Sequence, residues 1–169
     1  SKKVKIVDCT FDTKDNLRNR IEQIREDAEI SVRGGASHLI LSDQNISEER
    51  AIVPMILAVG AIHSHLVKLS LRGYASINVQ TSEAMDTHSF AVLIGVGATT
   101  VNPYLAIDSI FQRYEKKLFG ELDFASCVER FKKSINAGLL KIMSKMGISV
   151  LSSYRGGCNF EAVGLSRGL

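Results

Sequence analysis

The sequence predicts an α/β fold with alternating strands and helices, a mostly parallel sheet, and an arrangement like part of a (β/α) barrel. First, short apolar runs alternate with longer segments whose apolar residues recur every three or four positions, as in buried strands and amphipathic helices. Second, strands separated by helices pair in parallel through right-handed crossovers. Third, a glycine, a small or apolar residue, a hydroxyl residue and an apolar run recur at Gly35, Gly97 and Gly147. A glycine with positive φ can end a helix just before a strand, so the repeat indicates βα units.

The expected strands are short and mostly apolar, as in a parallel sheet that is covered on both faces. They are residues 4–8, 38–42, 75–80, 99–102 and 148–152. A closed barrel needs eight strands, so the chain is expected to form part of a barrel or an open doubly wound sheet.

The expected helices are amphipathic or begin at residues that favour a helix start. The first ends at the glycine pair 34–35, and Pro54 is expected in the first turns of the second. Ser82-Glu83 is expected to cap the third, and Pro103 to open the fourth. The expected helices are residues 15–32, 48–69, 82–95, 103–117, 124–146 and 158–163.

Composition excludes several classes of protein. The net charge is +3 with dispersed basic residues, so no nucleic-acid binding is expected. No run approaches the roughly 18 apolar residues of a transmembrane helix, so no membrane association is expected. Three widely spaced cysteines without a CxxC motif predict neither a disulfide framework nor a metal site. Free thiols fit a reducing compartment, so we expect a cytoplasmic protein.

The most suggestive candidate site is the turn after the last expected strand. Ligands of parallel α/β sheets bind at the carboxyl ends of strands. Gly156 and Gly157 would let the backbone approach an anion, the next helix would present free N–H groups, and Arg155 would add a guanidinium. Phosphate or carboxylate fits such a turn. The alternative is structural: the glycines only make the turn, and Arg155 pairs with a neighbouring acid.

Other polar residues near strand ends have structural explanations. Asp43 is expected as a hydrogen-bond acceptor. His63 and His65, two positions apart on a helix, do not share a face and are poor joint metal ligands. No nucleophile-elbow sequence is present, and no catalytic residue is expected in this chain.

Motifs along nearly the whole chain resemble the large subunit of glutamate synthase. The run from Met143 to Ser149, followed by Ser153-Tyr-Arg-Gly156, is the most specific. The motifs are Ile40-Leu-Ser-Asp43, Leu57 to His65, Glu83-Ala84, His88, Phe90 to Ala98, Val101 to Ala106, Gly138 to Ser149, Ser153 to Gly156 and Phe160 to Leu165.

The resemblance implies that residues 1–120 are central-domain-like and that residues 121–169 begin the FMN-binding synthase barrel, which this chain would contain only in part. It implies an oxidoreductase that makes glutamate from glutamine and 2-oxoglutarate with electrons passed through an iron–sulfur cluster and FMN. The other domains of the same polypeptide would be its partners. The iron–sulfur ligands and the amidotransferase nucleophile are absent from this chain, so we expect it to be inactive by itself.

Within this chain, the resemblance makes the segment near the last expected strand the candidate for contact with FMN or 2-oxoglutarate. The residues expected to contribute are Met146, Gly147, Ser149 and Arg155.

Two other interpretations remain open. One is a stand-alone flavin- or phosphate-binding module of another reductase, and the other is a non-catalytic interaction domain that dimerises through an open sheet edge. A parallel sheet that is cut part-way leaves an apolar edge, so we expect the chain to self-associate under each interpretation. The electron donor, NADPH or ferredoxin, is not indicated by this chain.

Overall fold

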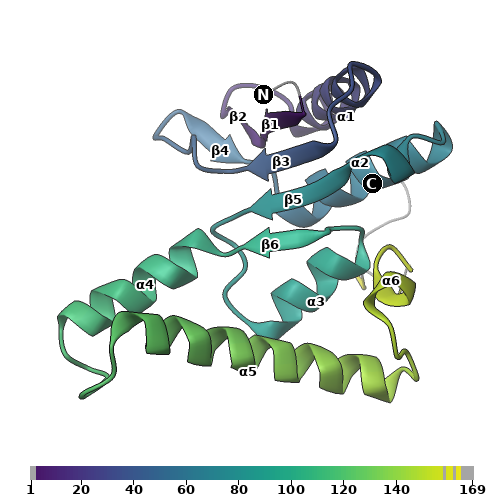
Figure 1. The fold of residues 1–169 in the computed structure, drawn as a ribbon. Coiled ribbons are helices and arrows are strands. Elements are labelled where there is room, and N and C mark those ends of the chain that lie inside the picture. Colours follow the sequence, from purple (N-terminus) through teal and green to yellow (C-terminus); the bar gives the residue numbers. More distant parts are fainter. Residues whose placement is uncertain (1–2, 158, 162, 165–169) are drawn as a thin grey trace.

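A four-stranded parallel sheet lies at the centre of the computed structural model, which describes residues 3–157, 159–161 and 163–164 (Figure 1). In spatial order the strands are β1 (Val4–Asp8), β3 (His38–Ser42), β5 (Ser76–Gln80) and β6 (Thr100–Asn102). Each pairs in parallel with the next. The order never reverses, as in part of a (β/α) barrel, whereas a doubly wound sheet reverses at a switch point. The predicted α/β fold with a mostly parallel sheet is confirmed.

Three helices follow the first three of these strands in sequence and build the core with them. They are α1 (Leu17–Arg33), α2 (Met55–Lys68) and α3 (Thr87–Gly95). Strand side chains alternate between the two faces of a sheet, and one set is almost fully buried. That set includes Leu39, Leu41, Ile77 and Val79. It packs in one apolar cluster with helix residues such as Ile24, Ala28, Ile62 and Leu66.

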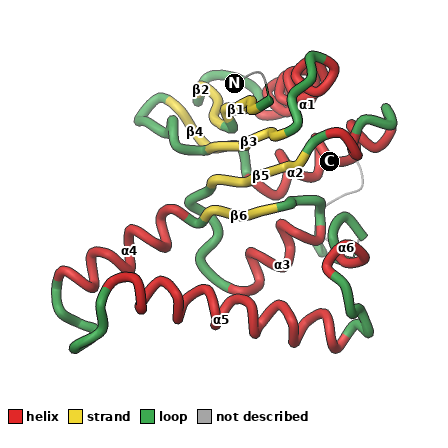
Figure 2. The backbone as a smooth tube through the Cα atoms, in the orientation of Figure 1, coloured by secondary structure: helices red, strands yellow, loops and turns green. Residues whose placement is uncertain are grey.

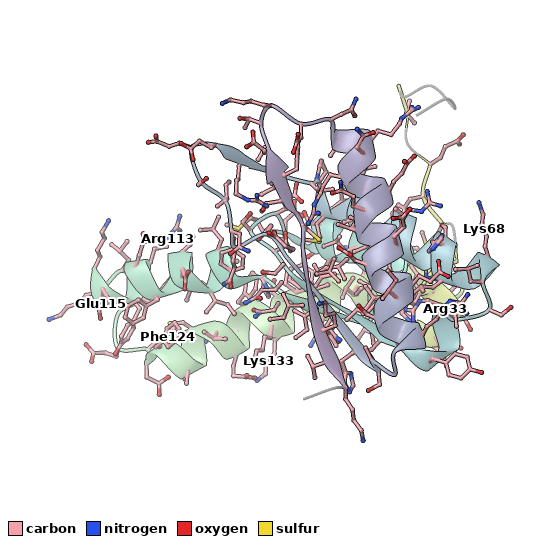
Figure 3. All side chains as sticks on the ribbon, turned by 90° about the horizontal axis from the view of Figure 1, so that it is seen from above. Arg33, Lys68, Arg113, Glu115, Phe124 and Lys133 are labelled. Carbon is pink, nitrogen blue, oxygen red and sulfur yellow. The ribbon has the colours of Figure 1, made fainter. Side chains whose placement is uncertain are left out.

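Two long helices form an arm that extends beyond the sheet (Figures 1 and 2). They are α4 (Tyr104–Glu115) and α5 (Phe124–Lys145), which pack on each other, and α5 also packs on α3. At the tip of the arm the rings of Phe111 and Phe124 meet edge to face, with centroids 5.4 Å apart. Figure 3 shows Arg113, Glu115 and Phe124 at the opposite side of the molecule from Arg33 and Lys68. Among the described residues, no helix is long and apolar enough to cross a membrane.

A second, two-stranded sheet is a feature that the sequence analysis missed. Strands β2 (Thr10–Asp12) and β4 (Arg50–Ile52) pair antiparallel beside the carboxyl end of β1. The helix predicted over 48–69 is therefore wrong at its start: α2 begins at Met55, and Pro54 is its N-cap. The residue before a proline avoids helical backbone angles, so strand pairing can end at this proline and the helix can begin after it.

The C-terminal segment differs from the prediction. Residues 148–152 do not form a strand. α5 ends at Lys145, Gly147 takes a φ of 70° two residues later, and a single turn, α6 (Leu151–Tyr154), follows. Tyr154 explains the difference. Its ring is fully buried against Ile94 and Met143, and its hydroxyl donates a 3.0 Å hydrogen bond to the carbonyl of Ala91. The segment is thus anchored on α3 and α5 instead of adding a strand to the sheet.

The helix predicted over 158–163 is also wrong where it can be compared. Residues 159–161 have no regular secondary structure, and residues 163–164 lie in a turn. Cys158 and Ala162 lie outside the described residues.

Candidate functional site

The buried carboxylate of Asp43 is the centre of the polar cluster at the carboxyl ends of β3, β5 and β6. Asp43 directly follows β3 and is 0% exposed. Its Oδ2 accepts hydrogen bonds from the Thr81 hydroxyl at 2.7 Å, the Ser82 backbone N–H at 2.9 Å and the Ser82 hydroxyl at 3.1 Å. One oxygen therefore joins the loop after β3 to the loop after β5. The sequence-based expectation of a structural acceptor agrees with this geometry.

The third loop reaches the same carboxylate through Tyr104, the first residue of α4. Burial raises the pKa of the Tyr104 phenol, the nearby Asp43 carboxylate raises it further, and a hydrogen bond with Ser82 acts in the opposite direction. Oδ1 of Asp43 is buried and has no hydrogen-bond partner among the described residues. The Asp43 cluster, defined as Asp43, Thr81, Ser82 and Tyr104, thus connects three consecutive loops.

Glu83 extends this cluster to α2. Its Oε2 accepts a 2.6 Å hydrogen bond from the backbone N–H of Met55, the first residue of that helix. The prediction that Ser82-Glu83 caps the following helix is wrong: α3 begins later, and its N-cap is Asp86, whose carboxylate accepts from the Ser89 N–H at 2.8 Å. The N-cap of α2 is a proline without a side-chain acceptor, so Glu83 satisfies an orphan N–H from a distant loop.

A second polar cluster lies at the carboxyl end of β1. The guanidinium of Arg50 donates to Asp8 Oδ2 at 3.1 Å and to the Thr10 hydroxyl at 2.6 Å. Arg20, on α1, donates to the backbone carbonyls of Asp8 at 2.7 Å and Thr10 at 3.0 Å. Thr10, Arg20 and Arg50 border a cleft of about 180 Å³ that acidic Asp12 and Asp15 also line. Because both guanidiniums already donate to protein oxygens, the cluster mainly fixes the turn between β1 and β2.

The ionisable groups of this second cluster are tuned by the same contacts. Burial raises the pKa of Asp8, but hydrogen bonds from Thr10 and Asn45 and the charge of Arg50 outweigh it, so the pKa lies below its usual value. The neighbouring thiol of Cys9 is fully buried, and burial together with the Asp8 charge raises its pKa to about 12. Thiolates, not thiols, are nucleophilic, so Cys9 stays inert at neutral pH.

The four residues predicted to contact a cofactor lie on the C-terminal segment. Met146 is the C-cap of α5 and is 43% exposed. Gly147 has open space around the position of a side chain, and Ser149 is exposed. These three residues lie on the surface and do not enclose a ligand by themselves. Arg155 is half-buried, and its charge adds to burial in lowering the pKa values of His63 and Arg72.

The glycine turn beside Arg155 approaches a histidine of the same chain. A Cβ atom on Gly156 would lie 2.6 Å from Cε1 of His63, and one on Gly97 would clash with the same imidazole. The Nε of Arg72 donates to His63 Nδ1 at 3.0 Å. Burial and the charges of Arg72 and Arg155 lower the pKa of His63, which favours the neutral ring. The predicted anion site assumed a strand before this turn and a helix after it. No strand precedes the turn, and no helix follows it among the described residues, so both assumptions are wrong.

Comparison with known sequences identifies the family. A sequence model described as the glutamate synthase central domain matches residues 1–166. The chain belongs to the glutamate synthase central domain family. The resemblance found in the motifs is therefore confirmed, while the predicted division at residue 120 stays a prediction.

Relatives of this central domain include both kinds of glutamate synthase. The chain is 54% identical over 166 residues to the glutamate synthase (NADPH) large chain of Azospirillum brasilense. The match covers 96% of this chain and 11% of the Azospirillum chain. It is 43% identical over 155 residues to the corresponding large chain of Bacillus subtilis (strain 168), with 90% and 10% covered. It is 42% identical over 161 residues to a ferredoxin-dependent glutamate synthase of Pyropia yezoensis, with 89% and 10% covered. This central domain thus spans about a tenth of the length of these relatives.

Sequence reasoning located part of the site and missed the rest. Asp43 could be found because it follows a recognisable apolar strand. Arg20 and Arg50 were missed, because their partners Asp8 and Thr10 are distant in sequence and three of the six hydrogen bonds are to backbone carbonyls. The contact of His63 with Gly156 gave no local signal, although a glycine with φ of 70° marks a turn where the chain can come close to another element.

Proposed function

We propose that the chain is the central domain of a glutamate synthase large chain and positions other parts of that enzyme without supplying catalytic groups. The whole polypeptide would transfer the amide nitrogen of glutamine to 2-oxoglutarate and form glutamate with reducing equivalents from NADPH or ferredoxin. The family match over residues 1–166 and the names of the relatives support this proposal. The cytoplasmic location predicted from the free cysteines belongs to the same proposal.

The environment of Asp43 is the observation that carries the non-catalytic role. A general base must reach the proton that it abstracts, and Asp43 is 0% exposed. Its Oδ2 already accepts three hydrogen bonds from neighbouring loops. The Cys9 thiol, with a pKa of about 12, is equally unsuited to act as a nucleophile. The chemistry-bearing side chains at the carboxyl edge therefore hold the loops of this domain together.

The proposed cofactors would be held mainly by other parts of the polypeptide. Met146, Gly147 and Ser149 do not form a cradle for FMN within this chain, so a flavin contact at these residues requires a surface from elsewhere and stays a prediction. Cys9 and Cys127 are both buried, and the described residues contain no cluster that could hold a metal ion. The ligands of an iron–sulfur cluster would likewise come from elsewhere.

The test uses the long polypeptide that contains this chain. We expect it to form glutamate from glutamine and 2-oxoglutarate with NADPH or reduced ferredoxin. We expect Asp43→Asn to lower its melting temperature while kcat of the folded variant changes by less than about threefold, below 1 kcal/mol in activation free energy. Absence of glutamate formation with either donor would refute the assignment. Loss of kcat in Asp43→Asn at an unchanged melting temperature would refute the non-catalytic role.

A separate experiment addresses the predicted ligand contact of Arg155. Arg155→Ala in the same polypeptide should lower the flavin content or raise the KM for 2-oxoglutarate if the guanidinium binds either molecule. Arg33→Ala is a suitable control, because Arg33 forms an exposed ion pair with Glu29 on α1. Unchanged flavin content and unchanged KM in Arg155→Ala would contradict the contact.

A further inference from the structure

The two faces of the four-stranded sheet differ sharply in burial. On the face covered by α1, α2 and α3, Leu39, Leu41 and Ile77 are 0% exposed. On the other face, here called the open face, Val4 is 43% and Ile6 63% exposed. The strand registers place the open-face residues in rows across the sheet. One row is Val4, His38 and Ser76, the next is Ile6, Ile40, Asn78 and Thr100, and the last is Asp8, Ser42, Gln80 and Asn102.

Of the eleven open-face residues in these rows, three are apolar and the other eight are polar, with Asp8 as the one carboxylate. Val4, Ile6 and Ile40 form a patch over β1 and β3. No lysine, arginine or glutamate occurs in the three rows, although charged residues make up 23% of the chain. The one carboxylate, Asp8, lies at the end of the face and is paired with Arg50. Depletion of charged residues is typical of the core of an interface, whereas a solvated sheet face also carries charged side chains.

The polar part of the open face is already organised by hydrogen bonds between its own side chains. The Thr100 hydroxyl donates to Asn78 Oδ1 at 2.8 Å, and Asn78 Nδ2 donates to the Ser76 hydroxyl at 2.9 Å. The Ser76 hydroxyl also lies 2.8 Å from Nδ1 of His38. A chain of bonds across three strands fixes these side chains before any partner arrives, and preorganised polar groups lose less entropy on association.

Parallel sheets are almost always covered on both faces, and barrels cover the second face from within. The strands here are wound in one direction, so the open face corresponds to the inner face of a partial barrel. The chain spans about a tenth of the length of its relatives, which leaves a large amount of polypeptide available to cover it.

We infer that the open face is an interface buried against another segment of the same polypeptide, outside these 169 residues, which presents uncharged, mainly apolar side chains to Val4, Ile6 and Ile40. The inference rests on the proposed function, because it takes the chain to be one domain of a longer enzyme. It adds to that proposal the surface through which the domain is held.

Thiol accessibility in the long polypeptide tests this inference. Ile6→Cys places a thiol on the open face, and Ile30→Cys is the matched control, since Ile30 is similarly exposed at 69% but lies on α1. The parent polypeptide gives the baseline for native cysteines, and each variant in guanidinium gives the unprotected rate. We expect native Ile6→Cys to react with maleimide at least about tenfold more slowly than when denatured, and Ile30→Cys near its denatured rate.

Three outcomes would contradict the inference. They are free reaction of Ile6→Cys, equal protection of both thiols, and protection that increases with protein concentration, which would indicate a second copy of the chain as the occupant. If Ile6→Cys does not fold, Thr100→Cys probes the opposite side of the same face with a smaller change.

Glutamate formation by the parent polypeptide separates the two proposals. An active enzyme with a freely reacting Ile6→Cys thiol would refute only the interface. A protected thiol in a polypeptide that makes no glutamate would refute only the proposed function.

Discussion

The carboxylate of Glu83 caps a helix that begins at Met55, 28 residues earlier in the chain, through a hydrogen bond of 2.6 Å. Pro54 occupies the N-cap of α2 and offers no side-chain acceptor. A negative charge at a helix N-terminus is stabilising because it faces the positive end of the helix dipole. The loop after β5 therefore helps to hold the helix that precedes β5.

This relationship predicts a stability effect of Glu83. Glu83→Ala should lower the free energy of unfolding by about 1 kcal/mol, the usual effect of losing an N-cap acceptor. Glu83→Gln should lose less, because its amide oxygen still accepts the bond. Urea denaturation measures both, with Glu26→Ala on the exposed face of α1 as the control. A loss in Glu83→Ala no larger than in the control would show that the bond does not stabilise α2.

The Asp43 cluster should be far more sensitive to substitution. Asp43→Ala would leave the donors of buried Thr81 and half-buried Ser82 without an acceptor, so we expect the free energy of unfolding to fall by roughly 3 kcal/mol. Asp43→Asn keeps an oxygen acceptor and should lose about half as much. The exposed Asp27→Asn is the control for charge removal. Equal urea midpoints for Asp43→Ala and the parent protein would contradict the role of the carboxylate in joining the loops.

Substitutions at Gly147 and Gly156 distinguish the effect of backbone strain from the effect of a steric clash. Gly147 and Gly156 both have φ of 70°, but a side chain at Gly147 meets open space and one at Gly156 meets the His63 ring. Gly147→Ala should lower the free energy of unfolding by about 1 kcal/mol through backbone strain alone. Gly156→Ala should lower it by about 1–3 kcal/mol more, because the ring must move or the segment must detach. Similar thermal shifts in the two variants would contradict the close packing of Gly156 on His63.

The neutral state of His63 predicts a dependence of stability on pH. Its folded-state pKa lies below the ordinary value of 6.5, so the unfolded chain binds more protons in the acid range. The stabilisation of the folded state by neutral His63 is complete above about pH 6.5, and it is lost as the pH falls from there through the folded-state pKa of His63. A proton on Nδ1 would also remove the acceptor of Arg72 and place a cation between two arginines.

We expect His63→Asn to flatten the stability profile between about pH 7 and pH 5, because the amide oxygen can accept from Arg72 but does not titrate. Thermal melts across this range measure the effect. His88→Asn, at an exposed histidine on α3, is the matched control for the loss of a histidine side chain. If the stability of His63→Asn depends on pH as steeply as that of the parent protein, other groups cause the pH dependence.

Local patterns were sufficient for the elements with strong periodicity. The apolar spacing of residues 15–32 and 124–146 predicted α1 and α5 closely, and the short apolar runs predicted β1, β3, β5 and β6. These predictions succeed because side-chain periodicity and glycine helix ends are properties of neighbouring residues. The motif content likewise sufficed for the family, and the family match confirmed it.

Long-range contacts decided the elements that were predicted wrongly. Residues 148–152 are as apolar as a strand, but the buried ring of Tyr154 binds the segment to α3 and α5. Residues 50–52 were read as helix, but pairing with β2 makes them a strand. In each case the residue is in contact with residues that are distant in the sequence. A local sequence pattern therefore cannot predict the contact.

The sequence by itself determined that this protein is an α/β member of the glutamate synthase family, since periodicity and motifs are encoded residue by residue. Only the tertiary structure decided that Asp43 ties three loops together, that Gly156 packs on His63, and that one face of the sheet is left open. Those facts depend on which distant residues meet, and burial, hydrogen bonding and pKa shifts arise only once they have met.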